Sequence, residues 1–170
     1  MPWVLIPVEG MKNTGLAVVK LMPRLEAEVL YTETVVDLST PRTYHAVADV
    51  FNLFAIDCMC LLVFETSLRS RDGKPVLLKA SSLTQRTIGA MEILASLSAT
   101  PIYHYDETEV KRGIAGKPNA SKTVVHGAVG LMLGWKQKPK GVDGHALDAV
   151  AVCLYHQSID GLGKRIGGAS

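Results

Sequence analysis

The most constraining feature of the sequence is the segment 141–157, GVDGHALDAVAVCLYHQ, which we interpret as a helix made almost wholly of small and apolar residues. His145 and Asp148 stand three residues apart near its start, and residues at this spacing share one face of a helix. Asp143 precedes them, where a carboxylate can cap unpaired backbone N–H groups. An ionisable pair is costly in a helix suited to complete burial. The segment therefore predicts a buried helix whose first turn is either merely capped or part of a functional site.

The composition is that of one folded domain. The chain has 170 residues, of which 48% are hydrophobic, and a net charge of +2. We expect a single domain over residues 1–170, with a basic tail from about residue 160. No apolar run is long enough to cross a bilayer, and the N-terminus lacks a signal-peptide pattern, so we expect a cytoplasmic protein with no membrane contact.

Cys58, Cys60 and Cys153 all lie in apolar stretches. We expect buried, reduced thiols there rather than a disulfide or a metal site. The Cys-x-Cys spacing is not that of a zinc knuckle, and no second Cys/His pair stands near it in the sequence.

The order of predicted elements indicates an α/β fold. Apolar runs and alternation predict strands over 3–8, 16–22 and 26–38, which would form an antiparallel meander. Beyond it we expect a helix opening at Ser39-Thr40-Pro41, a strand over 59–64, a helix over 76–97, a strand over 101–105, a short helix over 108–114 capped by Thr108, a helix over 122–133 and the final helix. This order predicts a mixed five-stranded sheet, with parallel strands after the meander and helices on both faces.

Two of the predicted strands end in carboxylates. Glu9 follows the first strand and Glu65 follows the fourth, and ligand sites form at strand ends in a sheet covered on both faces. Together with His145 and Asp148, they could hold two Mg²⁺ ions around a phosphodiester, one activating a water and the other stabilising the leaving 3′ oxygen. The net charge does not indicate a nucleic-acid partner, but bases cluster at 69–86 and 111–140, on either side of this proposed site.

Four segments of the chain resemble the RuvC family of Holliday junction resolvases, within the ribonuclease H-like superfamily. They are VLIPVEGMKNTG ending at Gly15, LLVFE ending at Glu65, EVKRGIAG with the downstream ASK ending at Lys122, and HALDA beginning at His145. The resemblance implies a ribonuclease H-like fold. It also implies an Mg²⁺-dependent endonuclease, able to use Mn²⁺, that makes paired symmetric nicks in four-way DNA junctions during recombination and repair, leaving 5′-phosphate and 3′-hydroxyl ends. A homodimer and a branch-migration helicase partner follow from the same resemblance, and we expect the 76–97 helix at the dimer interface.

The resemblance also assigns site residues. It implies that Glu9, Glu65, His145 and Asp148 are the catalytic metal ligands of a two-ion site. The residues that it implies for DNA contact are Leu68, Lys111 and Lys122, and the clusters of bases add Arg69, Arg71, Lys74 and Lys117. We expect His104 and His126 to be structural or exposed, and His156 to be structural at the end of the last helix. Trp135 could stack on a base or fill a gap.

Two positions depart from the family pattern. An ungapped match places Val8 where the family has its first Asp, and Glu9 comes one residue later. Leu68 stands where the family has an aromatic wedge, and it is apolar without a ring to stack. The sequence therefore leaves two alternatives open: a related nuclease acting on other branched DNA or structured RNA, and an inactive relative that only binds junctions.

Overall fold

The structure is a computed structural model that describes residues 2–9, 13–22, 26–36, 40–63 and 78–167. Its elements, in chain order, are β1 (Pro2–Glu9), β2 (Asn13–Leu21), β3 (Ala27–Val36), α1 (Thr40–Leu53), β4 (Met59–Val63), α2 (Leu78–Leu97), β5 (Ile102–Asp106), α3 (Glu107–Ala115), α4 (Lys122–Met132) and α5 (Gly144–Gly167). None of these helices is both long enough and apolar enough to cross a membrane.

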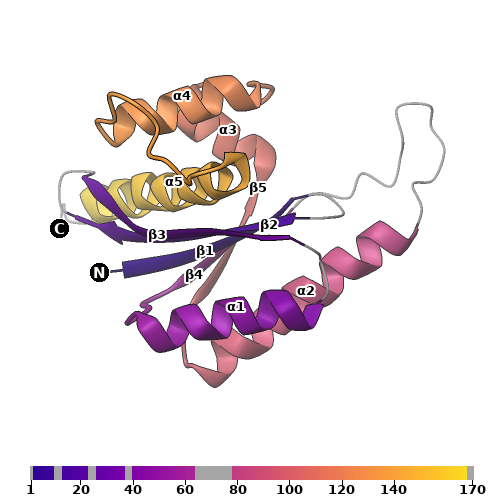
Figure 1. The fold of residues 1–170 in the computed structure, drawn as a ribbon. Helices are drawn as coiled ribbons and strands as arrows, with labels where there is room; N and C mark the ends of the chain where they lie inside the picture. The colour runs from indigo at the N-terminus through magenta and orange to yellow at the C-terminus, as the bar shows by residue number, and fades with distance from the viewer. Residues whose placement is uncertain (1, 10–12, 23–25, 37–39, 64–77, 168–170) are drawn as a thin grey trace.

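The five strands form one mixed sheet in the order β3-β2-β1-β4-β5. The first three strands pair antiparallel, whereas β4 pairs parallel with β1, and β5 pairs parallel with β4. Helices α1 and α2 cover one face, and α5 covers the other with α3 and α4 stacked outside it (Figure 1). The predicted five-stranded α/β architecture is therefore confirmed.

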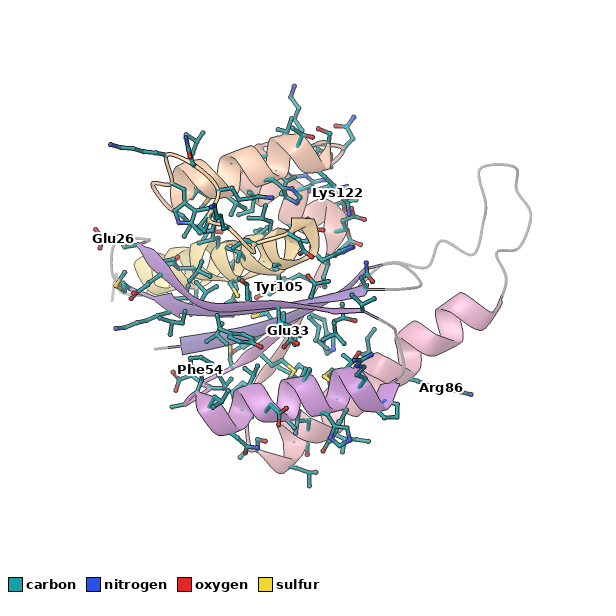
Figure 2. The ribbon with its side chains drawn as sticks, viewed as in Figure 1. Glu26, Glu33, Phe54, Arg86, Tyr105 and Lys122 are labelled. Atoms are coloured by element: carbon teal, nitrogen blue, oxygen red, sulfur yellow. The ribbon has the colours of Figure 1, made fainter. Side chains whose placement is uncertain are left out.

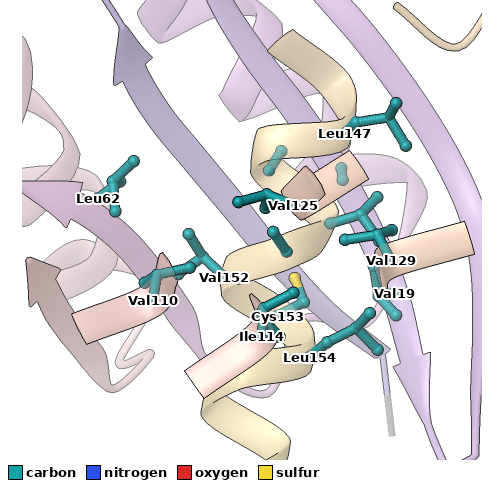
Figure 3. Packing of buried hydrophobic residues seen from close by; sticks show 14 of the residues in the cluster. Val19, Leu62, Val110, Ile114, Val125, Val129, Leu147, Val152, Cys153 and Leu154 are labelled. Carbon is teal, nitrogen blue, oxygen red and sulfur yellow. The ribbon is translucent and has the colours of Figure 1, made fainter. Parts of the chain in front are cut away.

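Alternation along β2 divides the core into two layers. Ala17 and Val19 belong to the cluster that packs with α5, whereas Leu16 packs with residues of α1 and α2. These side chains are at most 1% exposed, as expected for a strand covered on both faces. Residues 144–154 of α5 contribute more side chains to the first cluster than any other element, and Cys153 and Leu154 belong to it together with Ile114 of α3 (Figure 3).

Two helix boundaries differ from the prediction. Helix α5 continues to Gly167 instead of ending at Gln157, so most of the expected tail is helical. The added residues contain no proline, and each glycine costs a helix only about 1 kcal/mol relative to alanine. Helix α3 is capped by Asp106 and not by Thr108: the Asp106 carboxylate accepts a hydrogen bond from the Thr108 N–H at 2.7 Å, and the Glu109 side chain accepts one from the Asp106 N–H.

Candidate active site

The start of α5 is packed directly on β2 at Gly15. A Cβ atom added to Gly15 would lie 2.1 Å from the carbonyl oxygen of His145 and 2.4 Å from its carbonyl carbon. Contacts this short are incompatible with any side chain, so only glycine allows the strand and the helix to approach so closely. The Thr-Gly pair of the first motif thus has a structural role, which is to position the turn of α5 that carries His145.

Asp143 fixes the same helix end from outside. Its Oδ1 accepts hydrogen bonds from the Ala146 N–H at 2.9 Å and from the Thr34 hydroxyl at 2.6 Å, so it caps α5 and ties it to β3. Burial acts to raise the pKa of the Asp143 carboxyl, but the hydrogen bonds from Thr34 and Ala146 and the nearby His145 together lower it below the usual value. The expected capping role of Asp143 is confirmed.

His145 is half-buried and lies beside the first residue of β2. Its Nε2 is 3.2 Å from Nδ2 of Asn13. Because an amide nitrogen is a donor only, Asn13 donates and the imidazole Nε2 accepts when the ring is neutral. Asn13 therefore orients the His145 ring, a contact that the sequence analysis did not anticipate.

Strand register places Glu9 on the same face of the sheet as His145. In the β1–β2 pair, Glu9 lies opposite Asn13 and Val8 lies opposite Thr14, with no shift along the ladder. Directly opposed residues share a face, and odd-numbered β2 residues face α5. Glu9 thus occupies a position on the α5 face, whereas Val8 occupies one on the α1/α2 face.

Asp148, one turn after His145, contacts two basic side chains of α4. Its Oδ1 is 2.8 Å from Nε2 of His126, and its Oδ2 is 3.4 Å from Nζ of Lys122. The Asp148 side chain is only 12% exposed. Lys122 is the first residue of α4, whose N-cap Ser121 matches the predicted helix start (Figure 2).

The contact of His126 with Asp148 was not anticipated by the sequence analysis, which expected His126 to be structural or exposed. The available signal was its spacing: His126 lies four residues after Lys122, on the same face of α4. Because Lys122 resembles a family residue, the basic residue beside it on this face was a candidate for the same site. Lys122 and His126 both lie on α4, which faces Asp148. His126 precedes Asp148 by 22 residues in the sequence.

A small pocket joins Asp148 to both lysines expected to contact the scissile strand. Its volume is about 20 Å³, and it is lined by Leu62, Glu107, Val110, Lys111, Lys122, Val125, Asp148, Ala151 and Val152. Lys111 of α3 is held there by Glu107, whose Oε1 lies 2.5 Å from the lysine Nζ. The structure thus brings together Asp148, Lys111 and Lys122, on three helices and next to the end of β4, and His145 lies three residues before Asp148 on α5.

Several expected site residues lie elsewhere or outside the described residues. Those outside are Glu65, Leu68, Arg69, Arg71 and Lys74. Because β1 and β4 are parallel neighbours, their carboxyl ends lie at one edge of the sheet, and Glu65 follows β4 by two residues. Lys117 is exposed in the loop between α3 and α4.

The exposure of His104, Trp135 and His156 indicates the role of each residue. His104 is exposed and pairs with Glu92 at 3.2 Å, as expected of an exposed residue. Trp135 is half-buried against the α5 cluster and lines a cavity beside β3, which favours the gap-filling interpretation. His156 lies well inside α5, 5% exposed, so our expectation that it ends the helix is wrong.

One known protein family matches almost the whole sequence of the chain. A sequence model of the crossover junction endodeoxyribonuclease RuvC family matches residues 7–156, from the end of β1 through most of α5. The chain belongs to the RuvC family. The matched range includes every described residue of the site, and the implied ribonuclease H-like fold agrees with the sheet order and helix layers.

Individual RuvC proteins match over different lengths. The crossover junction endodeoxyribonuclease RuvC of Xanthomonas campestris pv. campestris (strain B100) is 34% identical over 79 residues, 46% of this chain and 44% of that protein. The matched part of the chain thus spans less than half the length of that relative. The corresponding protein of Rhodopirellula baltica is 29% identical over 151 residues, which cover 85% of this chain and 80% of the relative.

Solved RuvC structures have the same fold. The structure of T. thermophilus RuvC in complex with a Holliday junction substrate superposes with a TM-score of 0.80 at 25% identity, over 96% of both chains. The yeast mitochondrial Holliday junction resolvase superposes with a TM-score of 0.63 at 10% identity, over 95% of this chain and 80% of that one, which shows a shared fold.

The donor set fits the divalent metal that RuvC nucleases require. His145 and Asp148 offer an imidazole nitrogen and a carboxylate one helical turn apart, and Glu9 adds a carboxylate position on the same face. Oxygen donors with a single imidazole suit Mg²⁺ or Mn²⁺ better than a soft metal. The residues present are therefore compatible with the family's metal.

Proposed function

We propose that this protein is a Holliday junction resolvase, an endonuclease that makes paired symmetric nicks in four-way DNA junctions during recombination and repair. The observation that carries the proposal is the register of Glu9 opposite Asn13, whose side chain contacts His145 on α5. This register supports a site in which the strand-end residue Glu9 acts together with the His-x-x-Asp turn.

The proposed roles of the site residues follow from their chemistry. Glu9, Glu65, His145 and Asp148 would bind two Mg²⁺ ions, for which Mn²⁺ could substitute. When bound, the ions would supply an activated water and stabilise charge on the leaving 3′ oxygen. A metal-bound His145 has a proton on its other ring nitrogen, so Asn13 would then turn its amide oxygen toward Nε2 and accept that proton in a hydrogen bond, leaving Nδ1 for the metal. The products would carry 5′-phosphate and 3′-hydroxyl ends.

DNA contact would come from the basic side chains around the pocket. Lys111 and Lys122 line the same pocket as Asp148, where they would contact phosphates of the cut strand. Arg69, Arg71, Lys74, Lys117 and the apolar Leu68 would extend this surface. Since phosphate contacts release counterions, junction affinity should fall steeply with salt, and specificity would come from junction shape rather than base sequence.

We further propose that two copies act together in the cytoplasm, with a branch-migration helicase as the partner that presents the junction. Paired nicks need two sites, and α2 carries exposed apolar side chains that a second copy could cover. Ile93 is 60% exposed and Leu97 is 77% exposed. Helix α2 is therefore the proposed dimer interface.

A cleavage assay with three DNA substrates tests the function. A four-way junction, a fork and a linear duplex of equal length are incubated with the protein, with and without Mg²⁺. The proposal expects Mg²⁺-dependent paired nicks at symmetric positions in the junction and little cutting of the duplex. Preferential cutting of the fork would favour a nuclease for other branched DNA, and junction binding without cutting in Mg²⁺ or Mn²⁺ would favour an inactive binding protein.

A further inference from the structure

A second group of metal-ligating side chains lies apart from the candidate active site. Cys58 precedes β4, Cys60 lies within it, and His156 comes from α5. The two Sγ atoms and one ring nitrogen of His156 all lie within 4.8 Å of one another, and all three residues are buried. The third cysteine, Cys153, is buried one turn before His156 but is not in this group.

The spacing of the two sulfurs fits a tetrahedral metal site. Cys58 and Cys60 lie two residues apart, and their Sγ atoms are 3.9 Å apart. With Zn–S bonds of about 2.3 Å and a tetrahedral angle, two sulfur ligands lie roughly 3.8 Å apart. The thiols are therefore already separated as two ligands of one ion would be, and are too far apart for a disulfide bond.

The third ligand is held in place by its neighbours. The Tyr105 hydroxyl hydrogen-bonds Nδ1 of His156, and the Tyr103 ring centroid lies 4.7 Å from that of the imidazole. Tyr103 pairs with Cys60 and Tyr105 with Leu62 across the parallel β4–β5 ladder, so one strand pair positions these groups. A hydrogen-bonded, packed imidazole is typical of a metal ligand whose orientation is fixed in advance.

The charge around the thiols also favours a cation. All three side chains are buried, so two thiolates at this place would need a balancing positive charge. A divalent cation would balance two thiolates, and its binding would release both protons.

We propose that Cys58, Cys60 and His156 bind one Zn²⁺ ion that links β4 to α5. Two thiolates and one imidazole are ligands that Zn²⁺ prefers, and the Tyr105 hydroxyl, bonded to Nδ1, leaves Nε2 of His156 as the ligand atom. The site would be structural, because it is buried and separate from the Glu9–His145–Asp148 edge. From the sequence we expect reduced thiols rather than a metal site; the proposal keeps the reduced state, which such a site requires, and departs from that expectation because His156 comes from a distant helix.

The test uses Co²⁺ as a spectroscopic substitute for Zn²⁺. The full chain is stripped with a chelator, unfolded, and refolded without oxygen in Co²⁺ and excess Mg²⁺, which competes for the carboxylates of the other site. We expect one Co²⁺ per chain, sulfur-to-cobalt charge-transfer absorption, and loss of that absorption when one equivalent of Zn²⁺ is added. Oxygen and nitrogen ligands give no such charge-transfer band.

Single substitutions assign the ligands. Cys58→Ala and Cys60→Ala should each lose the band, whereas the matched control Cys153→Ala should keep it, since Cys153 is as buried but outside the group. Because a buried substitution can unfold the chain, the wild type is also tested alone: one equivalent of Zn²⁺ should raise the Tm of the stripped protein. A wild type with no sulfur band or no Tm shift, or a band that is lost only in Cys153→Ala, would overturn the proposal.

Discussion

Gly15 and His145 meet backbone to backbone, with room for no side chain between the strand and the first turn of α5. This contact joins the beginning of the chain to a helix 130 residues later and sets where the His-x-x-Asp turn lies. The position of the site therefore depends on a packing contact, in addition to the groups that would do the chemistry.

Gly15→Ala should destabilise the protein and impair its activity. The added methyl would overlap the His145 carbonyl, and overpacking of this kind costs about 1–3 kcal/mol. Chemical denaturation should show the loss of unfolding free energy. Gly127→Ala on α4 is the matched control: nothing lies within 4 Å of its Cβ position, so it should be neutral or slightly stabilising. Equal effects of the two substitutions would contradict the close approach at Gly15.

Glu9, and not Val8, should provide the first carboxylate. Glu9→Gln should lower junction cleavage by more than the roughly 10–100-fold that loss of an outer contact costs a metal site. Glu9→Asp should retain part of the activity. Adding Val8→Asp to Glu9→Gln should not restore cleavage, because residue 8 lies opposite Thr14 on the other face. Restoration by Val8→Asp would show that the register argument is wrong.

His126→Ala should weaken the metal site without abolishing DNA binding. The His126 ring contacts the Asp148 carboxylate at 2.8 Å, and removing such an outer contact lowers metal affinity by about 10–100-fold. The Mg²⁺ concentration for half-maximal cleavage should rise accordingly. His104→Ala, at the exposed histidine that pairs with Glu92, is the control and should leave the Mg²⁺ dependence unchanged. An unaltered Mg²⁺ requirement in His126→Ala would remove His126 from the site.

Much of the fold followed from local sequence patterns. Apolar runs and alternation located the strands, and Ser121 marked the start of α4, because these signals lie within a few residues of the structure that they specify. The length of α5 was underestimated, since its final residues carry no strong stop signal and the glycines there were compatible with either outcome.

What the sequence did not reveal depends on contacts between distant segments. The side of the sheet on which Glu9 lies follows from pairing with Asn13, and a slip of one residue would reverse it. The contacts of His126 with Asp148, and of Cys58 with His156, join residues from different elements. Spacing within one element shows which residues share a face, as for Lys122 and His126, but not which distant segment that face contacts.

Asp143 should make stability depend on pH in the acid range. Its folded-state pKa is lowered, so the stabilisation from its ionised form is fully present well above pH 3.8, the ordinary value, and is lost as pH falls through the folded-state pKa. Asp143→Ala should cost about 1 kcal/mol at neutral pH, as loss of a helix cap does. Denaturant midpoints over a pH series should show that the stability difference between wild type and Asp143→Ala shrinks below pH 3.8. A stability difference that stays constant across that pH series would contradict the role of ionised Asp143 as the cap of α5.

The most direct test of the central claim compares wild type with Asp148→Asn on a four-way junction in Mg²⁺. The substitution keeps the shape of the side chain and removes its charge, so junction affinity measured in Ca²⁺ or without metal should change little, while the cleavage rate should fall below detection. We predict binding without cutting for Asp148→Asn and paired symmetric nicks for the wild type. Undiminished cleavage by Asp148→Asn would contradict the assignment of this site.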